Sequence, residues 1–343
     1  MNELAANPET ELVTPPSSQI HLSPNQRAWR RFRRNRPAVI SSFFMLAILF
    51  LILIWPTLSK PNFASHLPRA MAQSPIEITD NQYSPPTENN WMGTDVNGRD
   101  LLSRIFYGAR ISLLIGLVGA GVSLVIGVFW GAVAGYVGGR WDSAMMRFVD
   151  VLYSLPSIVF VIVLITTLNG VLATIQSSGS TTITLIKGGK PIEWIPIAKF
   201  LALFVGLGAV SWLTMARIVR GQVLSLRTRN FVDASRALGA SHSRILLRHI
   251  LPNVYGIIIV YLTLTVPSII LYESFLSYLG LGIQPPQASL GSLIASGVEQ
   301  INSIRIYWWL IIFPGGMLAT TLLALNFIGD GLRDAFDPRS ENR

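Results

Sequence analysis

The sequence lacks cysteine and has few charged residues, and these two scarcities exclude several kinds of protein. Among its 343 residues there is no Cys, so no disulfide, thiolate zinc site or cysteine nucleophile can form. Asp, Glu, Lys and Arg make up only 13% of the chain, whereas hydrophobic residues make up 50%. In soluble domains about a quarter of the residues are charged. The composition therefore indicates a membrane protein.

Catalytic motifs are also missing. The chain has four histidines, which are His21, His66, His242 and His249. No two of them have the spacing of a metal-ligand pair such as His-Glu-x-x-His, and there is no Gly-x-Ser-x-Gly nucleophile elbow. A phosphate-binding loop requires Gly-x-x-x-x-Gly-Lys-Ser/Thr, and the run from Lys187 to Lys190 does not fit it. We therefore expect no enzyme activity, no metal and no cofactor in this chain.

Six apolar segments are present, and we read each as a membrane-spanning helix. The segments are 38–55, 111–134, 148–168, 200–215, 254–271 and 306–328. Small residues recur at every fourth position from Gly119 to Gly139, which favours close helix packing over the alternative of a pore-lining face. The predicted fold class is an all-α polytopic membrane protein with six transmembrane helices.

The distribution of Lys and Arg predicts the orientation. With the N-terminus inside, 18 of the 27 Lys and Arg residues lie on the cytoplasmic side. Both termini are therefore predicted to be cytoplasmic, with 1–37 and 329–343 as tails and 56–110 as an extracytoplasmic loop. The arginine cluster from Arg27 to Arg36 directly precedes the first span. We interpret it as an interfacial helix against anionic lipid rather than an RNA-binding arm.

A basic loop, residues 217–253, separates the fourth and fifth spans. The run from Asp233 to Leu238 predicts a short helix, which Gly239 ends because glycine readily adopts φ > 0. Ser241 can cap a second helix that reaches Ile250, and Pro252 is expected to stop it. A DNA-binding helix-turn-helix is the alternative, but membrane spans on both sides disfavour it. We expect a compact knob at the membrane surface.

This loop resembles the coupling loop of ATP-binding-cassette importer permeases. That pattern is Glu-Ala-Ala, three residues, Gly, nine residues, then Ile-x-Leu-Pro. The matching positions are Asp233, Ala234, Ser235, Gly239 and the run His249-Ile-Leu-Pro252. Asp replaces Glu, Ser replaces the second Ala, and His249 replaces Ile. His-Ile-Leu-Pro-Asn is similar to the oligopeptide/dipeptide (peptide/nickel) branch. The resemblance covers roughly 27–339, apart from a longer 170–199 loop whose role it does not explain.

The resemblance implies a type I importer permease with a core at 111–328 in a bacterial inner membrane. It implies an ATPase-coupling site formed by Asp233, Ala234, Ser235, Leu238, Gly239, Ala240, Arg244 and Pro252. The implied partners are a sister permease, two ATPase subunits that bind ATP and magnesium, an extracytoplasmic solute-binding protein and the lipid bilayer, with no nucleic acid. The implied function is import of short peptides, with nickel or another small solute as the alternative.

A secondary carrier or channel is the competing class. Carriers driven by ions or protons usually need ionisable groups within the membrane. The six segments contain essentially none, since Asp150 and Glu273 are expected at span ends. A calcium site near Asp95 is likewise disfavoured, because Arg99 stands where an EF-hand needs an oxygen ligand. The segment from Met92 to Arg110 resembles the stretch that precedes the second helix of peptide permeases. The resemblance implies a structural cap on the outer face.

Overall fold

The computed structural model describes residues 23–58, 73–177, 185–187, 190–192, 194–285, 287–301 and 304–336. Within that part of the chain, six helices are long and apolar enough to cross a membrane, which confirms the predicted number of spans. They are α2 (Arg36–Leu58), α4 (Leu101–Val137), α6 (Ser157–Ser177), α7 (Trp194–Leu226), α10 (Leu251–Tyr278) and α12 (Trp309–Phe336). The predicted tail before residue 23 and the residues after 336 lie outside the described residues.

Shorter elements connect these spans. They are α1 (Pro24–Arg34), α5 (Gly139–Ser154), α8 (Asn230–Ala237), α9 (His242–Arg244), a π-helical turn η2 (Ile245–Ile250), α11 (Leu290–Glu299) and the strands β1 (Leu185–Lys187) and β2 (Lys190–Ile192). The two strands form an antiparallel hairpin in which Leu185 pairs with Ile192 in the backbone register. This hairpin and the extension of α6 to Ser177 lie in the region predicted as a polar loop.

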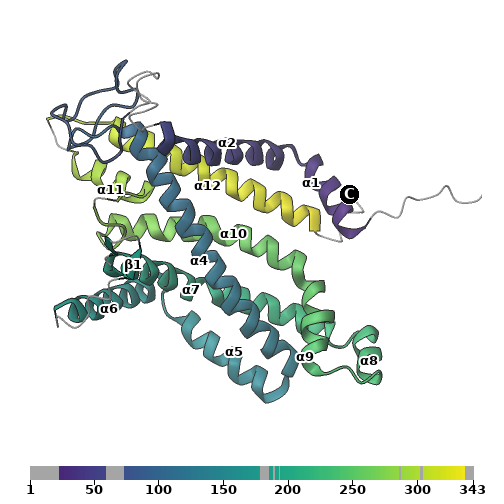
Figure 1. Cartoon of the computed structure of the whole chain (residues 1–343). Helices are drawn as coiled ribbons and strands as arrows, with labels where there is room; N and C mark the ends of the chain where they lie inside the picture. The colour runs from purple at the N-terminus through teal and green to yellow at the C-terminus, as the bar shows by residue number, and fades with distance from the viewer. Residues whose placement is uncertain are drawn as a thin grey trace, which may run out of the picture.

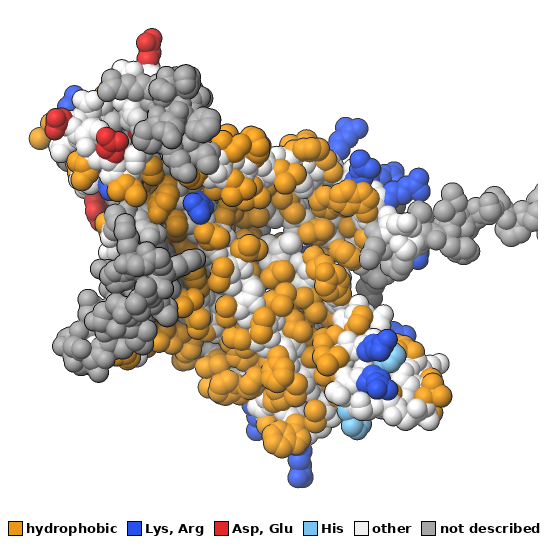
Figure 2. Space-filling model, in the orientation of Figure 1, with side chains coloured by type: hydrophobic (Ala, Val, Ile, Leu, Met, Phe, Trp, Pro, Cys, Tyr) orange, Lys and Arg blue, Asp and Glu red, His pale blue; other side chains and the backbone are white. Residues whose placement is uncertain are grey.

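The helices run between two chemically different ends (Figure 1). One end carries α1, α8, α9 and the last turns of α4 and α12, and the other carries α11 and the first turns of α4. Lys and Arg side chains gather at the first end, while hydrophobic side chains cover the middle (Figure 2). The positive-inside rule assigns the first end to the cytoplasm. There Asn35 of the α1–α2 junction donates a hydrogen bond to Asp334 of α12, at 3.3 Å.

The small-residue stripe of α4 packs directly against α7. A Cβ at Gly127 would lie 2.6 Å from Met215 Cβ, and one at Gly135 would lie 2.7 Å from the carbonyl oxygen of Arg220. One at Gly131 would overlap the carbonyl oxygen of Ala216. Lipid gives no hydrophobic drive for helices to associate, so the close backbone contact stabilises the pair. The packing interpretation is confirmed for the stripe up to Gly135, whereas Gly139 begins α5 and has open space around its Cβ.

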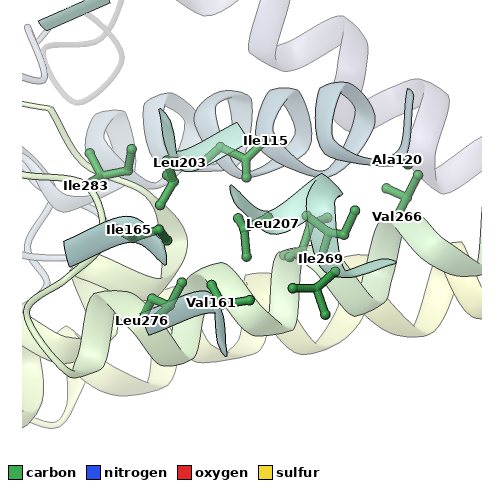
Figure 3. Close-up of a cluster of buried hydrophobic side chains, with 12 residues drawn as sticks. Ile115, Ala120, Val161, Ile165, Leu203, Leu207, Val266, Ile269, Leu276 and Ile283 are labelled. Atoms are coloured by element: carbon green, nitrogen blue, oxygen red, sulfur yellow. The ribbon is translucent and has the colours of Figure 1, made fainter. Parts of the chain in front are cut away.

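Toward the extracytoplasmic side, the spans share an apolar core (Figure 3). Ile115 of α4, Leu207 of α7 and Ile269 of α10 are fully buried there, and α6 contributes Val161 and Ile165. α4, α7 and α10 therefore form the central group of the molecule. Of the six spans, α6 is the least covered by the rest of the chain.

Several span boundaries differ from the predictions because caps and prolines, rather than hydropathy, set helix ends. α4 begins at Leu101 instead of residue 111, since the Asp100 side chain caps its first turn by accepting from Ser103 N. The predicted third span, 148–168, is broken at Pro156 into α5 and α6, and the predicted basic turn at 138–147 is the first part of α5. α12 continues to Phe336, so the tail predicted from residue 329 begins inside a helix.

Candidate coupling site

The first helix of the loop is α8, which one buried side chain anchors and most of whose other residues are exposed. Val232 is fully buried among residues of α7, η2 and α10. Asp233 lies in the first turn, as predicted, and its carboxylate accepts a hydrogen bond from Arg236 at 3.1 Å on the exposed surface. Asp233 and Ala234 are exposed, and Ser235 is half-buried. α8 therefore presents a water-facing surface on an apolar anchor.

Gly239 ends α8 with the geometry that the sequence predicts. Its φ is +78°, in the left-handed region that favours glycine. Gly239 N donates to Arg236 O at 2.9 Å, and Ala240 N donates to Ser235 O at 3.0 Å. These two bonds form a Schellman motif, which satisfies the last carbonyls of the helix. Nothing lies within 4 Å of a Cβ built at Gly239, so backbone conformation alone calls for glycine there.

Leu238, next to this turn, is the most exposed large hydrophobic residue of the loop. Its side chain is 88% exposed, although it lies at the cytoplasmic, water-facing end of the molecule. Exposed apolar surface of this kind marks interaction sites when it is grouped with other apolar residues. Leu247 of η2 is exposed as well. The loop therefore exposes two apolar side chains, Leu238 and Leu247, in addition to the Asp233–Arg236 ion pair.

The second arm departs from the prediction in its shape. Ser241 occupies the N-cap position of α9, but its side chain makes no capping hydrogen bond. α9 gives way to η2, in which Leu251 N donates to Leu246 O, five residues back. Ile245 and Ile250 are fully buried, while Arg244 and Arg248 are exposed.

Pro252 does not stop a helix, which corrects the prediction. It lies in the first turn of α10, directly after η2, and the helical path continues past it. The wider π turn before it accommodates the ring, and Asn253 Nδ2 donates to the carbonyl of His249 at 2.6 Å. The loop consequently continues into the fifth span without a break.

Contacts from distant parts of the chain hold the loop, and no local sequence pattern predicts them. Tyr136, at the end of α4, makes a 2.9 Å hydrogen bond between its hydroxyl and Nδ1 of His242. Arg227, just after α7, donates to the carbonyls of Gly135 and Tyr136 at 3.3 and 3.2 Å. A cation suits the carbonyl end of a helix. The loop is therefore joined to α4 as well as to α7 and α10.

At the opposite end, the Asp95 block is a structural cap. Asp95 Oδ1 accepts from the backbone N of Asn97 at 2.8 Å and of Arg99 at 2.9 Å. Its Oδ2 accepts from Arg99 Nε at 2.8 Å and also from Arg104. Both carboxylate oxygens are thus engaged by the residues around the start of α4. Among the described residues, no group of His, Asp and Glu has an arrangement that suits a metal ion.

Glu273 does not lie at the end of a span, contrary to the prediction. It sits inside α10 with 0% exposure, and Ser277 Oγ donates to its carboxylate at 2.6 Å. Ser112 of α4 lies 3.5 Å from the same carboxylate and also accepts from Leu290 N of α11 at 3.1 Å. The apolar run ends near Leu271, but the helix continues to Tyr278, which encloses the acid. Glu273 joins α4, α10 and α11.

Comparison with known proteins gives consistent matches along the chain. Residues 127–342 match the family described as "Binding-protein-dependent transport system inner membrane component", and residues 23–86 match the N-terminal TM domain of oligopeptide transport permease C. The chain is 44% identical over 314 residues to the oligopeptide transport system permease protein OppC of Escherichia coli K12, covering 92% of this chain and 91% of that one.

Two further similarities come from other proteins. The dipeptide transport system permease protein DppC of Bacillus subtilis is 40% identical over 333 residues, covering 97% of this chain and 90% of that one. Among solved structures, an inward-facing MetNI methionine ABC transporter aligns with a TM-score of 0.49 and 21% identity, over 68% of this chain and 97% of that chain.

Proposed function

The chain belongs to the family of binding-protein-dependent transport system inner membrane components, and on that premise we propose that it forms part of the route by which short peptides enter the cell. As a membrane-spanning permease subunit of an ATP-binding-cassette transporter, it is not itself the ATPase. The peptide substrate is supported by its identity to oligopeptide and dipeptide permeases along more than nine-tenths of its length.

The observation that carries the coupling part of the proposal is the exposed Leu238 at the turn made by Gly239. In this proposal, Asp233, Leu238 and Arg244 dock into a groove on a separate ATPase subunit. Two ATPase subunits would close against each other when they bind ATP. This closure would move two such loops, one on this chain and one on a sister permease. An extracytoplasmic binding protein would deliver the peptide on the other side.

Co-purification followed by uptake measurement tests this function. The tagged chain is isolated in mild detergent, its partners are identified by mass spectrometry, and the reconstituted complex is supplied with labelled peptides and with nickel. Recovery of an ATPase and a second permease, together with ATP-dependent peptide uptake, is expected. Uptake of nickel alone would replace the peptide substrate, and uptake driven by an ion gradient without an ATPase would overturn the importer assignment.

A matched pair of glycine variants tests the docking surface. Gly239→Asp is expected to abolish ATPase recruitment and uptake while leaving membrane insertion intact. Gly139→Asp is the control, because Gly139 also has positive φ, open space around its Cβ and a place at the cytoplasmic end, but lies outside the loop. Normal uptake by Gly239→Asp, or equal losses in both variants, would contradict the docking role.

A further inference from the structure

A cavity of about 410 Å³ lies between the α5–α6 junction, α7 and α10. Its volume falls in the range of roughly 300–1,000 Å³ that small-molecule sites occupy, which suits a short peptide but not a folded chain. None of the described residues that line it comes from α2 or α12. The cavity is partly open and lies beside α6, the least covered span. A neighbouring subunit can therefore complete its wall.

Hydroxyl groups dominate the polar part of this cavity. On α10, the residues Tyr261, Thr265, Ser268 and Tyr272 recur at helical spacing along one face and all line the cavity. From Tyr261 to Tyr272 the stripe extends about 16 Å at 1.5 Å per residue. α7 adds Ser211 and Thr214, and the α5–α6 junction adds Tyr153 and Ser157. None of the described lining residues carries a charge.

Three of the short hydroxyl side chains donate hydrogen bonds to carbonyls of their own helices. Thr265 donates to the carbonyl of Tyr261 at 2.7 Å, Ser268 to that of Leu264 at 3.2 Å, and Ser211 to that of Leu207 at 3.2 Å. Each oxygen keeps lone pairs that can accept a hydrogen bond from another molecule. The donors of Thr265, Ser268 and Ser211 are therefore satisfied within the chain, and their oxygens can still solvate a polar solute.

An ion pair of opposite charges contacts one lining residue of the cavity. Arg217 of α7 pairs with Asp150 of α5 at 2.7 Å, and its guanidinium lies 4.1 Å from the centre of the Tyr153 ring. Tyr153 lines the cavity, so this pair lies beside it. The described lining residues carry no charge that would trap or repel a charged solute.

We infer that this cavity is the part of the peptide path that this chain supplies, and that its hydroxyl stripe binds the peptide main chain without regard to the side chains. Leaving an amide unpaired in an apolar passage costs a few kcal/mol, so a path for peptides must offer hydrogen bonds. Hydroxyls donate and accept, and they rotate to suit either need. Conduction also requires several weak sites rather than one strong site.

The inference rests on the proposed peptide import, and a reconstituted complex in proteoliposomes tests it. Uptake is measured for peptides of one length with acidic, neutral or basic side chains. The double variant Thr265→Val/Ser268→Ala removes two hydroxyls at nearly constant volume. It is expected to slow uptake of all the peptides about fivefold to tenfold, without changing their order.

The matched control is Thr263→Val on the same helix. Thr263 also donates to its own helix, at 2.8 Å to Val260 O, but it lies next to Gly329 of α12, away from the cavity. Uptake by this control is expected to stay within twofold of the wild type. Equal effects of the control and the double variant would overturn the inference.

A charge placed on the stripe supplies a second readout that a folding defect cannot imitate. Ser268→Asp is expected to slow acidic peptides at least tenfold more than basic peptides. An equal effect on both, in a complex that still hydrolyses ATP, would remove the cavity from the path. If the wild-type complex transports no peptide at all, the proposed function itself fails, which is a distinct outcome from peptide uptake that these variants leave unchanged.

Discussion

The α4–α7 interface and the coupling loop are held together by different physics. Within the membrane, α4 and α7 approach closely through Gly127, Gly131 and Gly135, because lipid offers no hydrophobic drive. At the water-facing end, Val232, Ile245 and Ile250 anchor the loop by burial, worth about 1.5–3 kcal/mol for each side chain. Glycine is needed in the first region because a larger side chain would not fit between the helices. In the second region it is needed because the backbone has positive φ.

The largest effect is expected when the α4–α7 interface is filled. Gly131→Ala is expected to lower the free energy of unfolding by about 1–3 kcal/mol, since the new methyl overlaps the Ala216 carbonyl. Thermal unfolding in detergent measures the loss. Gly121→Ala is the control on the same helix, because nothing lies within 4 Å of its Cβ. Equal stability of the two variants would mean that close approach does not hold this pair.

In the loop, the corresponding change should affect coupling rather than global stability. Gly239→Ala forces a Cβ into the left-handed region at a cost of about 1–2 kcal/mol. Peptide uptake is expected to fall about fivefold to tenfold while the thermal midpoint stays near that of the wild type. Gly239→Asn should recover most of the uptake, because asparagine tolerates this conformation. A global loss of stability in Gly239→Ala would contradict the distinction.

A smaller effect is expected where the two regions meet. Tyr136→Phe removes only the hydroxyl that bonds His242 and leaves the ring in place. The expected result is about a twofold fall in peptides imported per ATP hydrolysed, since a hydrogen bond contributes roughly 0.5–1.5 kcal/mol. Tyr255→Phe is the control, because Tyr255 is 63% exposed. An unchanged ratio in Tyr136→Phe would separate α4 from the coupling movement.

The smallest expected effect concerns the extracytoplasmic cap of α4. Burial raises the pKa of the Asp100 carboxyl above its ordinary value of 3.8, although hydrogen bonds from Ser103 and Asn90 lower it in part. The folded state then binds the proton more tightly, so this contribution favours folding at low pH and is lost as pH rises through the folded pKa. The thermal midpoint of the wild type, relative to Asp100→Asn, should therefore be higher at about pH 4 than at about pH 7. The opposite slope would contradict the assignment.

Much of the architecture was predictable because it depends on local composition. Apolar runs predicted the six spans, the fourfold spacing of small residues predicted close packing, and Gly239 predicted the turn after α8. These signals lie in consecutive residues, so no tertiary information is needed to interpret them.

The features that sequence reasoning missed depend on contacts between distant residues. Tyr136 and His242 are 106 positions apart, and Glu273 is enclosed by Ser112, which is 161 positions away. The π turn before Pro252 likewise has no hydropathy signal, since the helix continues where a proline usually suggests a stop. Helix ends were misplaced for a related reason, because a single cap such as Asp100 outweighs the local polarity.

The uninterrupted passage from η2 into α10 makes this helix a lever. α10 has 28 residues, which is about 42 Å at 1.5 Å per residue. A rotation of about 5° at its cytoplasmic end would move its far end by roughly 4 Å over that length. Glu273 links that far end to α4 and the start of α11 through Ser112. In the proposed coupling, a small movement at the docking surface therefore becomes a larger displacement, at reduced force, at the extracytoplasmic end of α10.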